Sequence, residues 1–171
     1  MLAVGLNSGI YKFLLVLHIL SVIVGIGAVM LNGLYASQTA KRKGPEGRAI
    51  SEANYWVSGI AEYVIYTIPI WGILLILVSD DAWKFSQTWI WLALLLYIAA
   101  VGIAHAIMIP GHKRINELLA EMETVPASGA GGAPPQAAEA QQVGQRLAAG
   151  GMALNLLVVI IIALMVWKPG I

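Results

Sequence analysis

The 171-residue sequence contains no cysteine, which excludes disulfides, thiolate metal sites, iron–sulfur clusters and covalently attached c-type haem. It is also poor in charge, since 11% of its residues are Asp, Glu, Lys or Arg, against about 25% in soluble domains. The net charge is +1 and the basic residues form no long face, which argues against nucleic acid as a partner. Phosphate-binding glycine loops, nucleophile elbows and zinc-ligand spacings are missing. Apolar residues make up 59% of the chain, and this composition predicts a protein that lies mainly in lipid.

Four stretches are long enough to cross the hydrocarbon core of a bilayer, which takes about 20 apolar residues as a helix. They cover residues 10–37, 56–78, 88–110 and 147–167. The loops after the first and third stretches carry seven Lys and Arg residues and the opposite side carries three, so the positive-inside rule places both termini outside the cytoplasm. We therefore expect an all-α polytopic membrane protein, a four-transmembrane-helix bundle with both termini on the outer side.

The long segment between the third and fourth stretches divides into two parts, within a single membrane domain of residues 1–171. In residues 113–125, apolar side chains recur at helical spacing among glutamates, which predicts a cytoplasmic amphipathic helix. It could pack on the bundle, lie on the membrane surface or dock a partner. Residues 126–142 are rich in Ala, Gly, Pro and Gln and are expected to form a flexible linker.

Small and polar residues follow one side of the first stretch at steps of three, four, three and four, and a similar side recurs on the fourth. Helices associate in lipid through small residues and interhelical hydrogen bonds, so this polar stripe is expected to face other helices. Its members are His18, Ser21, Gly25, Ala28 and Asn32 on the first stretch and Asn155 on the fourth.

The depth of each polar group predicts which groups could meet. Counted at about 1.5 Å per residue from the inner ends of their spans, Glu62, His105 and Asn155 lie roughly 8 to 12 Å deep, in one inner layer. Glu62 and His105 are therefore candidates for a proton-handling pair, because a buried carboxylate must be neutralised or paired. The alternative is that Glu62 reaches water near the headgroups and His105 donates a hydrogen bond to another helix. His18 belongs to a separate outer layer.

The outer layer also contains Pro69, which frees the backbone carbonyl of Ile65 and predicts a kink in the second span. Two interpretations of His18 stay open. It is either an axial ligand to haem or a metal, or the donor of an interhelical hydrogen bond to Tyr66 or Tyr97. No cluster of metal ligands is expected from the sequence.

The run from Tyr11 to Leu20, which contains His18, and the ending Ile109-Pro110-Gly-His-Lys-Arg114 resemble the bacterial integral membrane family known as domain of unknown function 2269. Leu17-His18-Ile19 with later glycines is more distantly similar to the copper-resistance D family and the HemJ-type protoporphyrinogen oxidases. The latter resemblance implies a haem-associated histidine on the first helix and an essential lysine on a later one. Only His18 carries over, since no lysine lies within the second to fourth spans.

Two functional classes follow, both in a multi-pass protein of the bacterial inner membrane. The first is an accessory or structural four-helix protein, with the lipid bilayer and a second copy or another membrane protein as partners. The second is a haem- or copper-associated redox or proton-handling protein, with His18 as ligand and Glu62 with His105 as an inner-leaflet pair. A narrow transport pathway is a third hypothesis, because Pro69 permits helix rearrangement. Whether the chain is an enzyme stays open.

Overall fold

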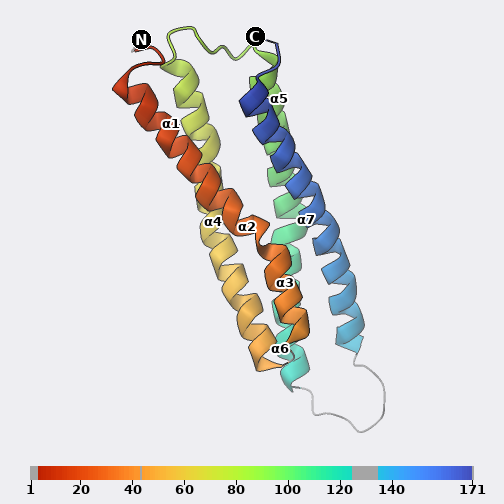
Figure 1. Ribbon diagram of the computed structural model, residues 1–171. Coiled ribbons are helices and arrows are strands. Elements are labelled where there is room, and N and C mark those ends of the chain that lie inside the picture. The colour runs from red at the N-terminus through yellow and green to blue at the C-terminus, as the bar shows by residue number, and fades with distance from the viewer. Residues whose placement is uncertain (1–3, 43, 125–134, 171) are drawn as a thin grey trace. The chain divides into compact units, whose positions relative to one another are not determined.

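The structure is a computed structural model that describes residues 4–42, 44–124 and 135–170. Within these residues all regular secondary structure is helical (Figure 1), and four continuous or near-continuous helical stretches are long and apolar enough to cross a membrane. They are Gly9–Lys41, Pro45–Leu77, Thr88–Glu123 and Gln136–Trp167. The expected all-α class with four spans is confirmed, while the side on which the termini lie stays a prediction.

The first stretch is not one regular α-helix. It comprises α1 (Gly9–Ser21), the π-helical turn η1 (Val22–Ile26), α2 (Gly27–Met30) and α3 (Asn32–Lys41), with a break at Leu31. Residues 22–27 combine β-branched side chains with two glycines, and both residue types lower helix propensity. The α-helical hydrogen-bond pattern is therefore only weakly favoured in this part of the span, and a π-helical turn replaces it.

The second stretch is the 33-residue helix α4 (Pro45–Leu77), which passes through Pro69 without ending. It is followed by a turn in which Asp80 and Asp81 both have positive φ angles, a conformation that aspartate tolerates better than most residues. Ser79 is 1% exposed and closes this turn, since its hydroxyl donates to Ile76 O and accepts from the backbone N–H of Trp83.

The third stretch consists of α5 (Thr88–Ile103), a second π-helical turn η2 (Ala104–Met108) and α6 (Ile109–Thr124). The helix thus runs on through the segment expected to be amphipathic. Its apolar side packs within the protein, because Leu118 is fully buried. The segment therefore packs on other parts of the chain, and its contact with the membrane surface or with a partner stays a prediction.

The fourth stretch is α7 (Pro135–Trp167), which begins earlier than the apolar span. The expected linker of residues 126–142 is only partly within the described chain: residues 126–134 lie outside it, and residues 135–142 form the first turns of α7. Ala, Gln and Glu dominate these turns and are strong helix formers, which explains why the helix extends beyond the membrane segment.

The chain divides into two compact units, each built from parts of all four stretches. Unit 1 comprises Met1–Val29, Gly59–Ala99 and Leu156–Ile171, and its core contains apolar residues of α4 and α5: Ala61, Ile68, Leu75, Trp89, Ile90 and Ala93. Unit 2 comprises Met30–Ser58 and Ala100–Asn155, with Leu118 and Asn54 as its buried side chains. Each unit is described separately below.

Candidate functional site

His18 of α1 lies against the backbone of α4 in unit 1. Its Nδ1 is 3.0 Å from the carbonyl oxygen of Ile68, and a carbonyl only accepts, so Nδ1 carries the proton and donates. The ring comes this close because residue 72 is glycine: a Cβ there would lie 3.3 Å from the imidazole Cε1. The hydrogen bond therefore joins a side chain of the first span to the main chain of the second.

Pro69 leaves the carbonyl of Ile65 without its intrahelical donor, as the sequence predicts. The hydroxyl of Tyr97, on α5, donates to this oxygen at 3.2 Å. Two neighbouring carbonyls of α4, those of Ile65 and Ile68, thus accept hydrogen bonds from side chains of two other helices. We call this arrangement of His18, Pro69 and Tyr97 the proline site.

The hydrogen-bond partner of His18 differs from the expected one. We expected a tyrosine hydroxyl, from either Tyr66 or Tyr97. The Tyr97 hydroxyl instead donates to Ile65, and the Tyr66 hydroxyl donates to Glu62 Oε1, one turn away on the same helix. His18 makes its hydrogen bond to the backbone carbonyl of Ile68.

Ser21 and Gly25 extend the contact of the first span with α4. The Ser21 hydroxyl lies 3.1 Å from the Thr67 hydroxyl, which in turn lies 2.7 Å from Val64 O. Gly25 is buried in η1, and a Cβ at this position would lie 2.8 Å from Cγ1 and 3.2 Å from N of Ile65. The stripe on the first span is therefore the surface by which η1 and α1 approach α4.

The remaining residues of the predicted sites lie in separate places. Asn32 is in unit 2, where its Oδ1 accepts from the Ser58 hydroxyl at 3.1 Å. Asn155 is exposed on α7, and a packing role for it stays a prediction.

Glu62 and His105 lie in different units, Glu62 in unit 1 and His105 in unit 2. Each has a partner on its own helix: Tyr66 donates to Glu62, and His105 Nδ1 lies 3.0 Å from Val101 O. The proposed sharing of a proton between them stays a prediction.

Comparison with known families supports the membrane assignment. Residues 12–169 match the family described as predicted integral membrane protein (DUF2269). The chain belongs to the DUF2269 family. The resemblance seen in the first and third spans is thereby confirmed over nearly the whole chain. No curated protein and no solved structure matches it.

Two buried polar groups of this DUF2269 chain were not singled out from the sequence. Asn54 is 5% exposed, and its Oδ1 has no hydrogen-bond partner among the described residues. The Nε1 of Trp89 is likewise buried without one in the described chain. Asn54 lies one turn before Ser58 on α4, and this spacing was the available signal that it faces the interior of unit 2.

Charged and hydrogen-bonding side chains of unit 2 connect α6 to its neighbours. Arg48 of α4 pairs with Glu123 at 3.0 Å, and Ser51 donates to Asn116 at 2.6 Å. Arg114 makes two hydrogen bonds to Glu139 of α7, at 2.8 and 3.0 Å, and also pairs with two glutamates of α6. Each ion pair is partly exposed and individually weak. Together with the buried Leu118, they fix the position of α6 within unit 2.

Aromatic residues gather at one end of unit 1. Trp83 donates from Nε1 to the Tyr11 hydroxyl at 2.9 Å and stacks edge-on against Trp89. The Lys168 ammonium lies 4.0 Å from the centre of the Trp83 ring, a cation–π contact. This cluster has the composition of a membrane–water interface.

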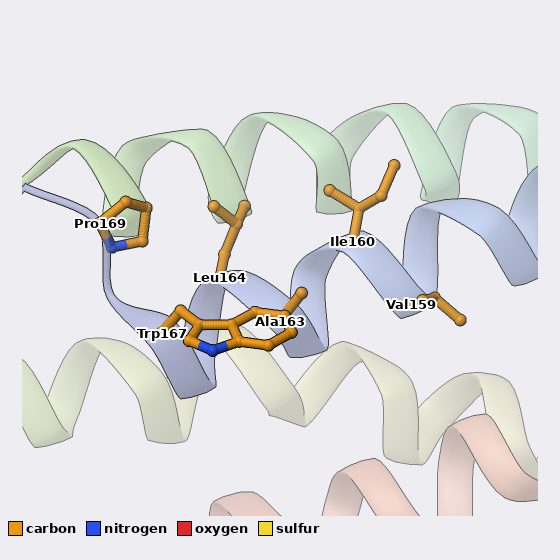
Figure 2. Close-up of a pocket in the computed structure, with 6 residues that line it drawn as sticks. All are labelled: Val159, Ile160, Ala163, Leu164, Trp167 and Pro169. Carbon is orange, nitrogen blue, oxygen red and sulfur yellow. The ribbon is translucent and has the colours of Figure 1, made fainter.

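A shallow hollow of about 220 Å³ lies near the same end of α7. Figure 2 shows its lining side chains, with Ile160 and Leu164 directed toward the neighbouring helix and the Trp167 ring along the side of α7. All six lining residues are apolar, so the hollow offers lipid contact and no polar chemistry. Within the described residues, no group of three His, Asp or Glu side chains is arranged to hold a metal ion.

Proposed function

We propose that this chain is an accessory or structural protein of the bacterial inner membrane, in which the polar groups inside the spans hold helices together. The observation that carries the proposal is the hydrogen bond from His18 to the carbonyl of Ile68. It gives the most distinctive polar side chain of the first span a structural role that needs no ligand. Ser21 with Thr67, and Asn32 with Ser58, support the same interpretation.

The physical basis is the weakness of apolar association in lipid. Lipid tails solvate Leu and Ile as well as another helix does, so small residues and hydrogen bonds determine which helices pack together. Gly25 and Gly72 supply close approach, and His18 and Ser21 supply the hydrogen bonds. The orientation, with both termini outside the cytoplasm, rests on the distribution of Lys and Arg in the loops. The inner-membrane location rests on the resemblance to a bacterial integral membrane family.

The partner in this accessory role is a second copy of the chain or another membrane protein. The apolar side of α6 is already used within unit 2, since Leu118 is buried there. The membrane-spanning stretches also expose large apolar side chains, which either lipid or such a partner would cover. These side chains include Tyr63, Ile98 and Met152, which are 76%, 65% and 72% exposed.

One observation favours a second candidate, a haem- or copper-associated redox or proton-handling protein. When the ring is neutral, donation from Nδ1 to Ile68 leaves the lone pair of Nε2 available to a metal. Metal-ligating histidines commonly have this arrangement, with one nitrogen donating to a carbonyl and the other toward the metal. In this candidate His18 is the ligand, and Glu62 and His105 handle protons.

A visible absorption spectrum of the detergent-purified chain, with and without added haem, distinguishes the two candidates. The accessory role predicts no Soret band and no change on adding haem, for the wild-type chain and His18→Ala alike. A Soret band that disappears in His18→Ala and persists in the matched variant His112→Ala would overturn the accessory role in favour of the second candidate.

A further inference from the structure

A groove of about 570 Å³ lies in unit 2, between α7 and the segment formed by the end of α5, η2 and α6. The two helical segments approach closely on either side of it. A Cβ at Gly111 would lie 2.6 Å from the Leu147 side chain, and one at Gly150 would lie 3.2 Å from Ile107. The groove is therefore formed where small residues let these helices pack together.

The lining of the groove is amphiphilic. Its charged members are two arginines, Arg114 and Arg146, and none of its lining residues in the described part of the chain is a carboxylate. The other lining residues are apolar, including Ile103, Ile107 and Ala153. A ligand that fits has an anionic end and a hydrocarbon part.

The arginines stand at the point where both helices change from polar to apolar. Arg146 is the last charged residue of α7 before the apolar stretch of residues 147–167, and Arg114 follows the apolar stretch of residues 88–110. Ala153 is seven residues beyond Arg146, or about 10 Å along the helix. The groove thus runs from the level of lipid headgroups into the level of lipid chains.

The two arginines differ in their availability. Arg114 is engaged by Glu117, Glu121 and Glu139, so carboxylates already compensate its charge. Arg146 is exposed, and no carboxylate of the described residues pairs with it. A guanidinium that faces a groove without a carboxylate is suited to a phosphate, whose oxygens it can bind through two donors.

We propose that this groove binds one anionic phospholipid, with its phosphate on Arg146 and an acyl chain against Ile103, Ile107 and Ala153. Basic pockets between transmembrane helices at the membrane surface are a known type of lipid-headgroup site. A free phosphate would leave the apolar part of the groove empty. A zwitterionic lipid would bring its phosphate together with a quaternary ammonium, which offsets the negative charge that Arg146 binds.

The test is native mass spectrometry of the full chain in detergent, incubated with phosphatidylglycerol or with phosphatidylcholine of the same acyl chains. We expect phosphatidylglycerol to be retained about fivefold more, which is the effect of one arginine near an anionic lipid. Arg146→Gln should abolish the preference. Lys113→Gln is the matched control, because Lys113 is an exposed cation at the same end of unit 2 that does not line the groove.

A second variant tests the apolar part of the site without changing charge. Ala149 lines the groove and is exposed, so Ala149→Leu should fill the space and reduce retention of both lipids. Equal retention of the two lipids by the wild-type chain would overturn the proposal, and so would equal effects of Arg146→Gln and Lys113→Gln. Binding of inorganic phosphate without any preference for phosphatidylglycerol would also overturn it.

Discussion

The hydrogen bond from Tyr97 to Ile65 can be tested in two ways, by removing its donor or by restoring the intrahelical donor that Ile65 lacks. Ile65 requires a partner from another helix because Pro69 has no N–H. Tyr97→Phe removes the donor and leaves the carbonyl in an apolar environment. Pro69→Ala restores the N–H, so that Ile65 regains its intrahelical bond and no longer needs Tyr97.

The expected magnitude follows from the geometry. Interhelical hydrogen bonds in membranes contribute about 0.6 kcal/mol on average and about 1.7 kcal/mol at most. The Tyr97 bond is 3.2 Å long, beyond the usual range of about 2.5 to 3.0 Å for a hydroxyl donor. We therefore expect Tyr97→Phe to lower the free energy of unfolding by about 0.6 kcal/mol. In the Pro69→Ala background the same change should be close to neutral.

The assay is reversible unfolding in mixed micelles by titration with sodium dodecyl sulfate, followed by circular dichroism of the helices. The four chains of a double-mutant cycle give the coupling energy between Tyr97 and Pro69. Tyr63→Phe is the matched control, because Tyr63 is 76% exposed on α4. Equal destabilisation by Tyr97→Phe in both backgrounds would refute the role assigned to the proline-freed carbonyl.

Three further predictions use the same unfolding assay. Gly25→Ala places a methyl group 2.8 Å from a side-chain carbon of α4 and should lower the free energy of unfolding by about 1 to 3 kcal/mol. The control is Gly27→Ala, whose methyl group meets nothing within 4 Å and should leave stability unchanged. Equal effects of the two variants would contradict the close approach of η1 to α4. Leu118→Ala should lower the free energy of unfolding by about 2 to 5 kcal/mol, because the Leu118 side chain is fully buried. Met152→Ala, at an exposed position, should lower it by far less. The reverse order would show that α6 does not pack as described. Glu62→Gln keeps an acceptor for the Tyr66 hydroxyl and should change the free energy of unfolding by less than about 0.5 kcal/mol. A marked loss of stability would instead indicate that Glu62 is a charged, paired carboxylate.

The four spans could be predicted because crossing a bilayer requires long apolar runs, and these are visible in the sequence. The internal breaks could not be predicted with the same ease. Both π-helical turns, η1 and η2, begin within continuous apolar stretches. Their positions depend on which side chains of other helices they meet, and a single helix does not determine that. The early start of α7 at Pro135 was missed because composition alone does not distinguish a linker from an exposed helix.

At the candidate site, too, interactions within one helix could be predicted from the sequence and interactions between helices could not. The freed carbonyl of Ile65 followed from Pro69 alone, because the i to i−4 relation is local. The donors to Ile65 and Ile68 were harder to assign, since several polar side chains lie at the same depth and compete for partners. The hydrogen-bond interpretation of His18 named Tyr66 or Tyr97 as partner, although a backbone carbonyl, here that of Ile68, is an equally good acceptor.

The acceptors of the proline site are main-chain atoms, and this affects how the site can change in evolution. His18 donates to the carbonyl of Ile68 and Tyr97 donates to the carbonyl of Ile65, and every amino acid possesses such a carbonyl. Substitutions at positions 65 and 68 therefore keep both hydrogen bonds as long as the new side chain fits. Positions 18 and 97 have no such freedom, so selection should act on one member of each pair, and paired substitutions between partners are not expected.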